Sequence, residues 1–401
     1  MPAEEDTGAA AVSRELPIRN IEPDTESFDI VKTYHRLLAE DTDLIMPLAA
    51  IEAMIEALRH MSSSTVHETM DLLKEQSAKL QSSVENPIAV YHGTDLFQQY
   101  FLKQLKQPGP DSETTSSHKN FEVVREQLLR NGTSFVQKAK QAREKIAWVG
   151  RRYIRDNYTI LTYGGSRAVE VLLTRATETQ GGDPPRRFKV IHVADEARPA
   201  KSDRVVAALR EKGVKVATIP STAVAFAMET VDRVVVGAEA VTSNAGIISG
   251  MGTYPIALIA KAYKKEVFVA TEQYKFGDTY PSYQSSLGFP GFKQNIINYQ
   301  SNRTPQQDAA QPPANPVDYT PPEYITSFFT DQGDLAPQAV RRNILEFIVD
   351  KPVELPIRLT QALLWNLDDG EYLMNNIRKC EPRWIMALLE VDLNIITREL
   401  V

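Results

Sequence analysis

Beyond residue 150 the chain alternates short apolar runs with segments of helical periodicity, and this alternation limits the fold more than any other feature. The runs YTILTYG, RFKVIHVAD, VKVATIP, DRVVVGAE and VFVATEQ are rich in Val and Ile and too short for helices. Apolar runs of this kind suit strands that are buried on both faces. Helix-like segments such as SRAVEVLLTRAT and SDRVVAALREKG separate them. The order strand, helix, strand therefore predicts an α/β fold, a Rossmann-like doubly wound parallel sheet.

The preceding part of the chain has a different period. FDIVKTYHRLLAE and MPLAAIEAMIEALRHM each place apolar side chains on one helical face, and Pro47 suits a first helical turn. We therefore expect an N-terminal helical domain over residues 27–150 and the α/β domain over residues 151–340. The polar residues 1–26 predict a flexible tail, and the Pro-, Gln- and Asn-rich stretch at about 300–317 predicts a disordered insert. YITSFFTD reads as a further strand, with a helix beginning at Pro337.

The segment from 341 to 401 contains IRLTQALLWNL and PRWIMALLEVDLNIITREL, which both have helical apolar spacing. This spacing predicts a C-terminal helical extension. Three explanations remain open from the residues alone: an appendage packed on the α/β domain, a partner-binding tail, and an errant gene model, since translated non-coding sequence can look mildly amphipathic.

Composition excludes several classes of protein. The chain is 42% hydrophobic and 24% charged, which is typical of a soluble globular protein, and its formal charge of -7 argues against nucleic acid held by bulk electrostatics. We find neither a signal peptide nor the ~18 uninterrupted apolar residues of a membrane span. The single cysteine, Cys380, cannot form an internal disulfide. We therefore expect a cytoplasmic protein with protein or small-molecule partners, and neither a membrane nor a nucleic acid among them.

Ligands of a parallel α/β sheet bind beyond the carboxyl ends of its strands. This rule predicts that one cleft has a rim of four segments, Tyr163–Arg167, Asp195–Pro199, Gly237–Thr253 and Glu272–Phe276. Within the third of these segments, GAEAVTSNAGIISGMGT, we expect a loop of small residues that leads into a helix. We expect no metal or cofactor. The candidate binding residues are Thr162, Tyr163, Gly164, Gly165, Ser166 and Arg167, then Glu196 and Arg198, and then Glu239, Asn244, Ser249, Gly252 and Thr253.

Each rim segment also has a purely structural interpretation. TYGGSR can hold an anion on its backbone N–H groups and helix dipole, or it can be a tight strand-to-helix turn. DEARPAKSD can bind a polar ligand or form a solvated loop with an internal salt bridge. Glu239 can face the cleft, or it can be buried and paired with Arg167 or Arg198.

The ordered set ILTYGGSRAV, DEARP, VVVGAEAVTSNAGIISGMGTYPIALIAKAYKK and DYTPPEYITSFFTDQGDLAPQAV resembles the alpha subunit in the regulatory-subunit family of translation initiation factor 2B, over residues 27 to 340. This family shares its fold with sugar-phosphate aldose–ketose isomerases of the methylthioribose-1-phosphate type. In those isomerases a cysteine and an aspartate move the protons or the hydride. The cysteine's place falls here on Gly164 or Gly165, the aspartate's place falls on Glu239, and the isomerases' Asn-Lys pair becomes Ser249-Gly250.

The resemblance therefore implies a regulatory subunit that is not an enzyme, because glycine supplies no titratable group for acid–base work. Isomerase activity is the alternative. The resemblance further implies a homodimer that docks beta and delta subunits, in a complex whose gamma and epsilon subunits carry guanine nucleotide exchange. Inhibition by initiation factor 2 phosphorylated on its alpha subunit would lower translation under stress. Basic residues of the first helices, such as Lys32 and Arg36, are candidates for reading that phosphate, and the cleft is expected to hold a sugar phosphate or a nucleotide.

Overall fold

The computed structural model describes residues 28–41, 44–61, 65–84, 86–106, 141–179, 182–289 and 315–348, together with a few scattered residues between these ranges. The tail predicted for residues 1–26, most of the insert predicted at about 300–317, and the extension beyond Ile348 lie outside the described residues. The chain divides into two compact units, Met1–Arg341 and Arg342–Val401. The residues that line the cleft described below all belong to the first unit.

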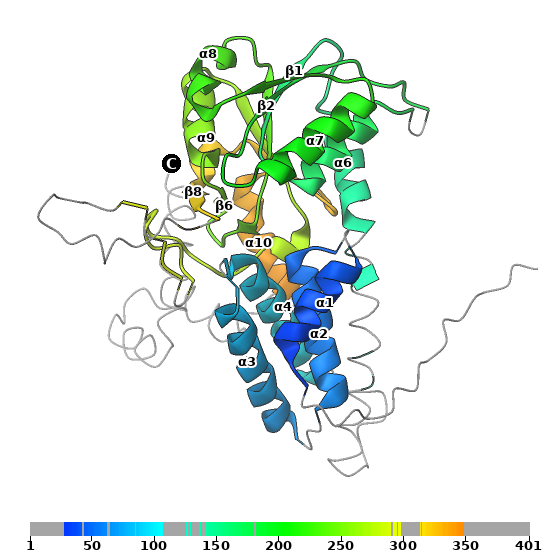
Figure 1. Cartoon of the computed structure of the whole chain (residues 1–401), viewed down its shortest axis with the longest axis vertical. Helices are drawn as coiled ribbons and strands as arrows, with labels where there is room; N and C mark the ends of the chain where they lie inside the picture. Colours follow the sequence, from blue (N-terminus) through cyan, green and yellow to red (C-terminus); the bar gives the residue numbers. More distant parts are fainter. Residues whose placement is uncertain are drawn as a thin grey trace, which may run out of the picture. The chain divides into compact units, whose positions relative to one another are not determined.

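The described residues of the first part of this unit include helices α1 (Ile30–Glu40), α2 (Met46–His60), α3 (Val66–Ser82) and α4 (Ile88–Lys106) (Figure 1). Side-chain caps fix two of their starts, because Asp29 accepts a hydrogen bond from the Val31 amide and Thr65 accepts one from the Glu68 amide. Their apolar faces pack into one core. It includes Ile30, Tyr34, Leu48, Ile51, Met54, Leu58, Leu73, Leu80, Val90 and Phe97.

Helices α2 and α4 approach closely at Gly93, where an added Cβ would overlap the Pro47 carbonyl oxygen. We expect Gly93→Ala to lower the free energy of unfolding by about 2–3 kcal/mol, because backbone must move to admit the methyl group. At a helical site with free space, Gly→Ala would instead raise the free energy of unfolding by about 1 kcal/mol. The sign of the change therefore shows whether α2 and α4 approach closely at Gly93. Urea unfolding measures the effect, with Gln98→Ala on the same helix as the control. A stabilised Gly93→Ala variant would contradict the close approach.

The second part of the unit is built on a seven-stranded sheet in the order β10-β9-β7-β4-β1-β2-β3. Neighbouring strands are parallel except β9 and β10. Helices α6 and α7 cover one face and helices α8 and α9 the other (Figure 1), which confirms the predicted doubly wound fold. The bounds are β1 Thr159–Tyr163, α6 Arg167–Ala176, β2 Lys189–Val193, α7 Pro199–Glu211, β3 Lys215–Ile219, α8 Val224–Met228, β4 Arg233–Gly237, α9 Thr253–Ala262, β7 Glu266–Ala270, β9 Ser327–Thr330 and β10 Gly333–Leu335.

A second, antiparallel sheet joins β5 (Ala240–Val241), β6 (Ile247–Gly250) and β8 (Val317–Thr320). The expectation of a loop between Glu239 and the following helix was therefore wrong. Strands of two to four residues carry too little periodicity to be recognised, and the partner β8 lies about seventy positions further along the chain. The predicted strand in YITSFFTD is β9, and α10 (Pro337–Ile348) begins at Pro337 as expected.

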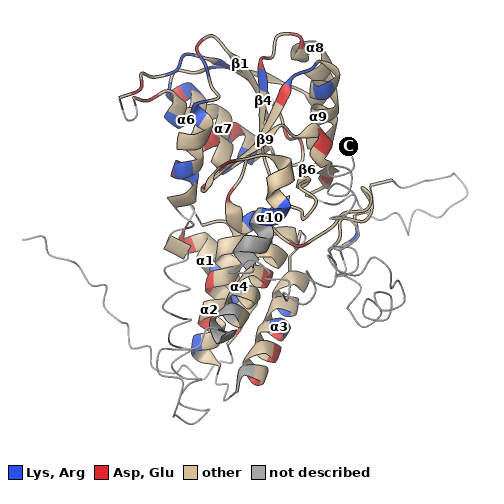
Figure 2. Ribbon diagram, turned by 180° about the vertical axis from the view of Figure 1, so that it is seen from behind, with Lys and Arg blue, Asp and Glu red and all other residues tan. Residues whose placement is uncertain are grey.

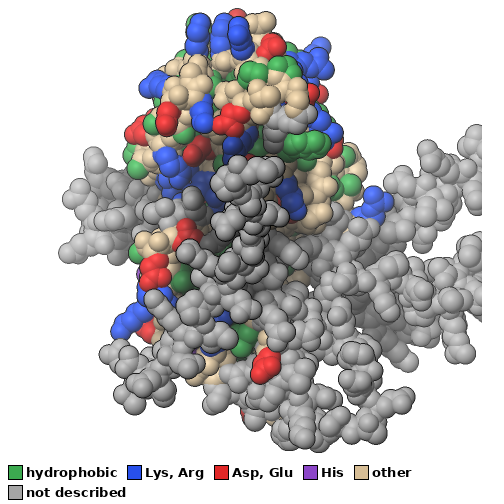
Figure 3. Space-filling model, turned by 90° about the vertical axis from the view of Figure 1, so that its right-hand side faces the viewer, with side chains coloured by type: hydrophobic (Ala, Val, Ile, Leu, Met, Phe, Trp, Pro, Cys, Tyr) green, Lys and Arg blue, Asp and Glu red, His purple; other side chains and the backbone are tan. Residues whose placement is uncertain are grey.

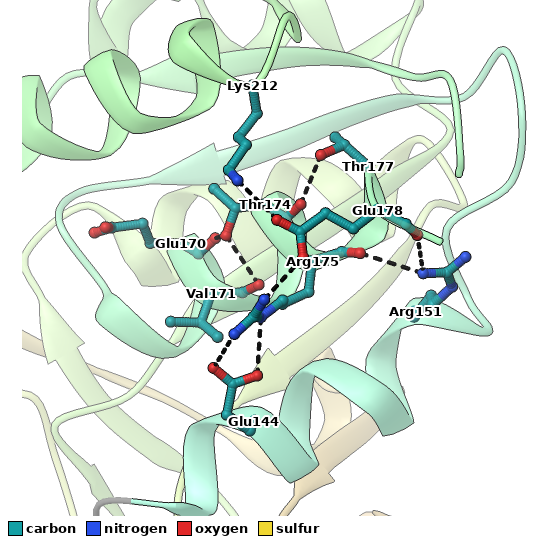
Figure 4. Close-up of polar contacts among 9 residues, drawn as sticks. All are labelled: Glu144, Arg151, Glu170, Val171, Thr174, Arg175, Thr177, Glu178 and Lys212. Carbon is teal, nitrogen blue, oxygen red and sulfur yellow. Dashed lines mark hydrogen bonds and ion pairs between the residues drawn. The ribbon is translucent and has the colours of Figure 1, made fainter. Parts of the chain in front are cut away.

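Ion pairs and hydrogen bonds fasten the helical residues 141–151 to the α/β part (Figure 4). Arg175 on α6 donates to both carboxylate oxygens of Glu144, at 2.8 and 2.9 Å, and to Glu178 at 2.8 Å. Lys212 binds the second oxygen of Glu178 at 2.7 Å. This network joins the end of α6 to the end of α7 and to the helix that enters the sheet.

Charged side chains of both signs are distributed over the described surface. In Figure 2, Lys and Arg are interspersed with Asp and Glu along the helices and strands of the α/β part, and the face in Figure 3 carries side chains of both signs. Mixed signs of this kind produce a weaker long-range field than a patch of one sign. Among the helices that the structure describes, none is long and apolar enough to cross a membrane.

Candidate functional site

The cleft lies where the strand order reverses, between β1 and β4. Strand β1 pairs with β2 on one side and with β4 on the other, so the segments after β1 and β4 separate above the sheet and leave a crevice. The cavity there has a volume of about 250 Å³. Residues Leu44–Pro47 and Ala89 of the helical part close its opposite wall. The site therefore lies between the sheet and the helices that precede it.

A chain of ion pairs and hydrogen bonds crosses this cleft. The Arg198 guanidinium donates to Asp195 at 2.8 Å and to Glu239 at 2.5 Å, and the second oxygen of Glu239 accepts from the Asn86 side chain at 2.8 Å. Asp195 is buried, with 3% of its surface exposed. Of the alternatives that the sequence left open for Glu239, the structure shows pairing with Arg198 in the wall of the cleft.

Gly250 makes room for this arrangement. A Cβ at position 250 would overlap the terminal nitrogen Nη2 of Arg198, so any side chain there would displace the guanidinium. The resemblance places a lysine at this position in the isomerases. In this chain the guanidinium of Arg198 takes up the space instead.

Glu272 is a structural carboxylate at the floor of the cleft. Burial alone would raise the pKa of Glu272, but Lys275 at 2.8 Å and Arg143 at 3.3 Å outweigh that effect and lower the pKa to about 2. The carboxylate is therefore ionised at neutral pH and neutralised by its two cations. It holds no proton that it could transfer to a ligand.

Cations outnumber carboxylates among the described residues that line this cleft. Arg204 binds Glu170 at 3.0 Å, and Arg198 and Lys275 have the partners given above. Lys201 lines the same cavity, and within the part of the chain that the structure describes its ammonium has no carboxylate partner. Desolvation and then the nearby Arg198 lower the pKa of Lys201. The cleft thus presents an uncompensated positive charge, which suits a small anionic group.

Eight of the thirteen predicted residues line the cavity, and five do not. Thr162 is buried within β1, Glu196 is exposed, and Asn244 bonds to Thr242 and Tyr319 in the second sheet. Gly252 and Thr253 form the start of α9. The lining residues are Tyr163, Gly164, Gly165, Ser166, Arg167, Arg198, Glu239 and Ser249.

The candidate binding residues omitted the cations Lys201, Arg204 and Lys275, although the rim segment that contains Lys275 was expected, and the helical wall was not expected at all. A signal for the first two existed. Helix α7 begins at Pro199, and residues spaced three apart in a helix share a face, so Arg198, Lys201 and Arg204 follow one another along the cleft. Residues 44–47 carry no comparable signal, because only the packing of the helical part brings them to the sheet.

Asp318 is a buried carboxyl close to the cleft but outside its lining. Its Oδ2 accepts hydrogen bonds from the Gly252 and Tyr254 amides at 2.7 and 3.0 Å, while its Oδ1 has no partner among the described residues. Desolvation raises the pKa of Asp318 to about 7, despite these amides. Within the described ranges, no group of three His, Cys, Asp or Glu side chains is arranged to hold a metal ion.

Comparison with known proteins assigns the family. Residues 39–337 match the Initiation factor 2 subunit family. The chain belongs to this family. It is 32% identical over 332 residues to translation initiation factor eIF2B subunit alpha of Dictyostelium discoideum, covering 80% of this chain and 97% of that protein. Identity to the protein of the same name from Caenorhabditis elegans is 26% over 324 residues, covering 80% and 98%.

The family also contains enzymes. A ribose 1,5-bisphosphate isomerase of Pyrococcus furiosus is 28% identical over 293 residues, which covers 73% of this chain and 85% of the isomerase. Among solved structures, eIF2B beta of Chaetomium thermophilum has a TM-score of 0.60 at 17% identity, covering 80% of this chain and 90% of that one. This likeness shows the shared fold.

Proposed function

We propose that this chain is a non-catalytic regulatory subunit of eIF2B, the guanine nucleotide exchange factor for initiation factor 2. The proposal rests first on the alpha-subunit relatives, which match over nearly their whole length. Its second support is the first rim segment of the cleft, where the resemblance to the isomerases puts Gly164 or Gly165 at the place of their cysteine. A cleft that keeps its walls without a reactive thiol at this place suits binding rather than proton transfer.

The carboxylates of the cleft support the same proposal. Glu239 stands at the place of the isomerases' aspartate, but both of its oxygens are already bound, one by Arg198 and one by Asn86. Its side chain is also longer than aspartate by a methylene, and a displacement of about 1 Å can cost roughly 100-fold in rate. Glu272, the other carboxylate of the lining, is neutralised by Lys275 and Arg143.

In this role the chain forms a homodimer in the cytoplasm and docks beta and delta subunits within a complex that also holds gamma and epsilon. A solved complex of related subunits is the eIF2B beta2-delta2 tetramer of C. thermophilum. Exposed apolar side chains on the segment after β7 favour such docking, since Tyr280, Tyr283 and Ile297 are 62%, 73% and 69% exposed. The helical part would take part in binding initiation factor 2 phosphorylated on its alpha subunit, which lowers translation under stress.

Purification from native extract tests this assembly. We expect the tagged chain to co-purify with the other four eIF2B subunits, identified by mass spectrometry, and the isolated chain to scatter light as a dimer of twice 44.9 kDa. A monomer that retrieves no translation factor would refute the proposal.

Isomerase activity is the second candidate, favoured by the archaeal relatives. We expect the purified chain to convert ribose 1,5-bisphosphate into its ketose isomer no faster than buffer does, because glycine stands where the isomerases' cysteine moves a proton. Product formation followed by chromatography checks this, with one of the archaeal isomerases as the positive control. Turnover at enzymatic speed would refute the proposal that the chain is a non-catalytic regulatory subunit.

The cleft itself we assign to a small phosphorylated ligand, a sugar phosphate or a nucleotide, that favours assembly. The loop Gly164–Ser166 at the start of α6 and the Lys201 ammonium are the groups that would hold its phosphate. At about 250 Å³ the cavity suits a compact ligand. Calorimetry with hexose phosphates that gives neither heat nor a thermal shift would remove this part of the proposal.

A further inference from the structure

One hydrogen bond connects the wall of the cleft with the first turn of α4. Asn86 stands two residues before α4 begins, and its Oδ1 accepts from the Ile88 amide at 3.1 Å, which fixes the start of that helix. Its Nδ2 donates to Glu239 at 2.8 Å, across 153 positions of sequence. Asn86 is itself buried, with 8% of its surface exposed.

The other oxygen of Glu239 belongs to the cleft. It accepts from Arg198 at 2.5 Å, and Arg198 is the residue that precedes the first turn of α7. The carboxylate of Glu239 is therefore shared between a donor of the helical part and a cation that lines the cavity. If the bond from Arg198 weakens, more negative charge remains on the Glu239 carboxylate to attract the Asn86 amide, and the reverse holds if the bond from Asn86 weakens.

We propose that Asn86 and Glu239 couple the binding of a small anion in the cleft to the anchoring of the first turn of α4. This coupling rests on the ligand-binding role proposed above. Asn86 is not among the residues that line the cavity, so it acts through Glu239 as a positioning residue.

The direction of the coupling follows from electrostatics. An anion that enters beside Lys201 and Arg198 competes with Glu239 for the guanidinium and is repelled by its carboxylate. When the anion takes the guanidinium, Glu239 loses its hydrogen bond from Arg198. That loss costs less free energy while Asn86 still donates to the Glu239 carboxylate, because a hydrogen bond to the charged form stabilises that form. Asn86 therefore favours anion binding, and by thermodynamic reciprocity a bound anion strengthens the bond from Asn86.

The first test measures anion affinity. With inorganic phosphate as the probe in calorimetry, we expect Asn86→Ala to raise the dissociation constant about three- to tenfold. The matched control is Gln99→Ala, which removes a side-chain amide within α4 that donates to the Asp95 carboxylate at 2.7 Å, away from the cleft lining. Glu239→Gln should tighten phosphate binding, and in that background Asn86→Ala should have no further effect.

The second test follows the backbone amide of Ile88, first without a ligand and then with phosphate. Hydrogen exchange of the Ile88 amide should slow at least threefold in Arg198→Met, because Glu239 then relies on Asn86 alone. Phosphate should slow the same amide in the native chain. The first turn of α3, which Thr65 caps, serves as the internal reference and should not change in either experiment.

The outcomes separate the two proposals. Equal phosphate affinity for Asn86→Ala and Gln99→Ala, together with an unchanged Ile88 exchange rate in Arg198→Met, overturns the coupling and leaves the ligand role standing. A native chain that binds no phosphate, but whose Ile88 amide slows in Arg198→Met, overturns the ligand role and the coupling to an anion, and leaves only the contact between Asn86 and Glu239 supported. If the effects of Asn86→Ala and Glu239→Gln on phosphate affinity are non-additive, and the Ile88 amide exchanges more slowly in Arg198→Met, both the ligand role and the coupling are supported.

Discussion

We expect Arg151→Met to lower the free energy of unfolding by about 3–5 kcal/mol, because it removes one buried cation that serves four backbone carbonyls. Arg151 is 3% exposed and lies at the end of the helical residues 141–151. Its guanidinium donates to the carbonyl of Arg175 in the last turn of α6 and to that of Glu178 just after the helix (Figure 4). It also donates to the carbonyls of Asp183 and Pro184.

The physical reason is that the last carbonyls of a helix have no intrahelical donors. Methionine keeps the length of the side chain but supplies no N–H group, so the carbonyls of Glu178, Asp183 and Pro184 lose the donor that Arg151 provides. The helix dipole adds to the loss, since a cation at a helix C-terminus is favourable.

Arg152→Met is the matched control, because the Arg152 side chain is 55% exposed and its ion pair with Asp334 is long, at 3.7 Å. We expect it to cost less than about 1 kcal/mol. Guanidinium unfolding followed by circular dichroism measures both variants. An Arg151→Met variant within about 1 kcal/mol of the native chain would mean that water replaces the guanidinium at these carbonyls.

The burial of Arg151 could not be predicted from the sequence, whereas the parallel sheet could. The parallel sheet was predictable because five short runs rich in Val and Ile alternate with helical segments. The expectation that each run is buried on both faces was wrong for VKVATIP, because it forms β3 at the edge of the sheet, where most of its side chains are exposed. Nothing in the local pattern distinguishes Arg151 from Arg152, yet one side chain is buried and the other exposed. That difference arises from the packing of residues 141–151 against α6.

The candidate site divides in the same way. Glu239 and Arg198 were both expected at the rim, because each follows a strand of one parallel sheet, and their pairing was one of the alternatives. Asn86 was not expected there, because its contact with Glu239 depends on how the helical part docks on the sheet. The second sheet was missed for a related reason, since β6 finds its partner β8 only after the chain has passed through β7.

The pH dependence of stability should carry the signature of Asp318. Its pKa is about 7 in the folded protein, against the ordinary 3.8 of an aspartate side chain in an unfolded chain, so the folded state binds the proton more tightly. The resulting stabilisation is fully present below about pH 4 and is lost as the pH rises to 7. At 1.36 kcal/mol per pKa unit, the loss amounts to about 4 kcal/mol.

Asp318→Asn isolates this contribution, because the amide cannot ionise while its oxygen can still accept from the Gly252 and Tyr254 amides. We expect the difference in unfolding free energy between variant and native chain to shift by about 3–4 kcal/mol in favour of the variant between pH 4.5 and pH 8. Urea unfolding across this range measures the shift, and the exposed Asp203→Asn is the control.

The difference between the two curves is informative because other titrating groups cancel in it. Glu272 acts in the opposite sense, since its pKa is lowered to about 2 and its contribution is lost as the pH falls through the acid range. Both proteins contain Glu272, so its effect is common to both curves. A difference that stays constant from pH 4.5 to 8 would mean that Asp318 is ionised throughout, and that the start of α9 holds a buried negative charge at neutral pH.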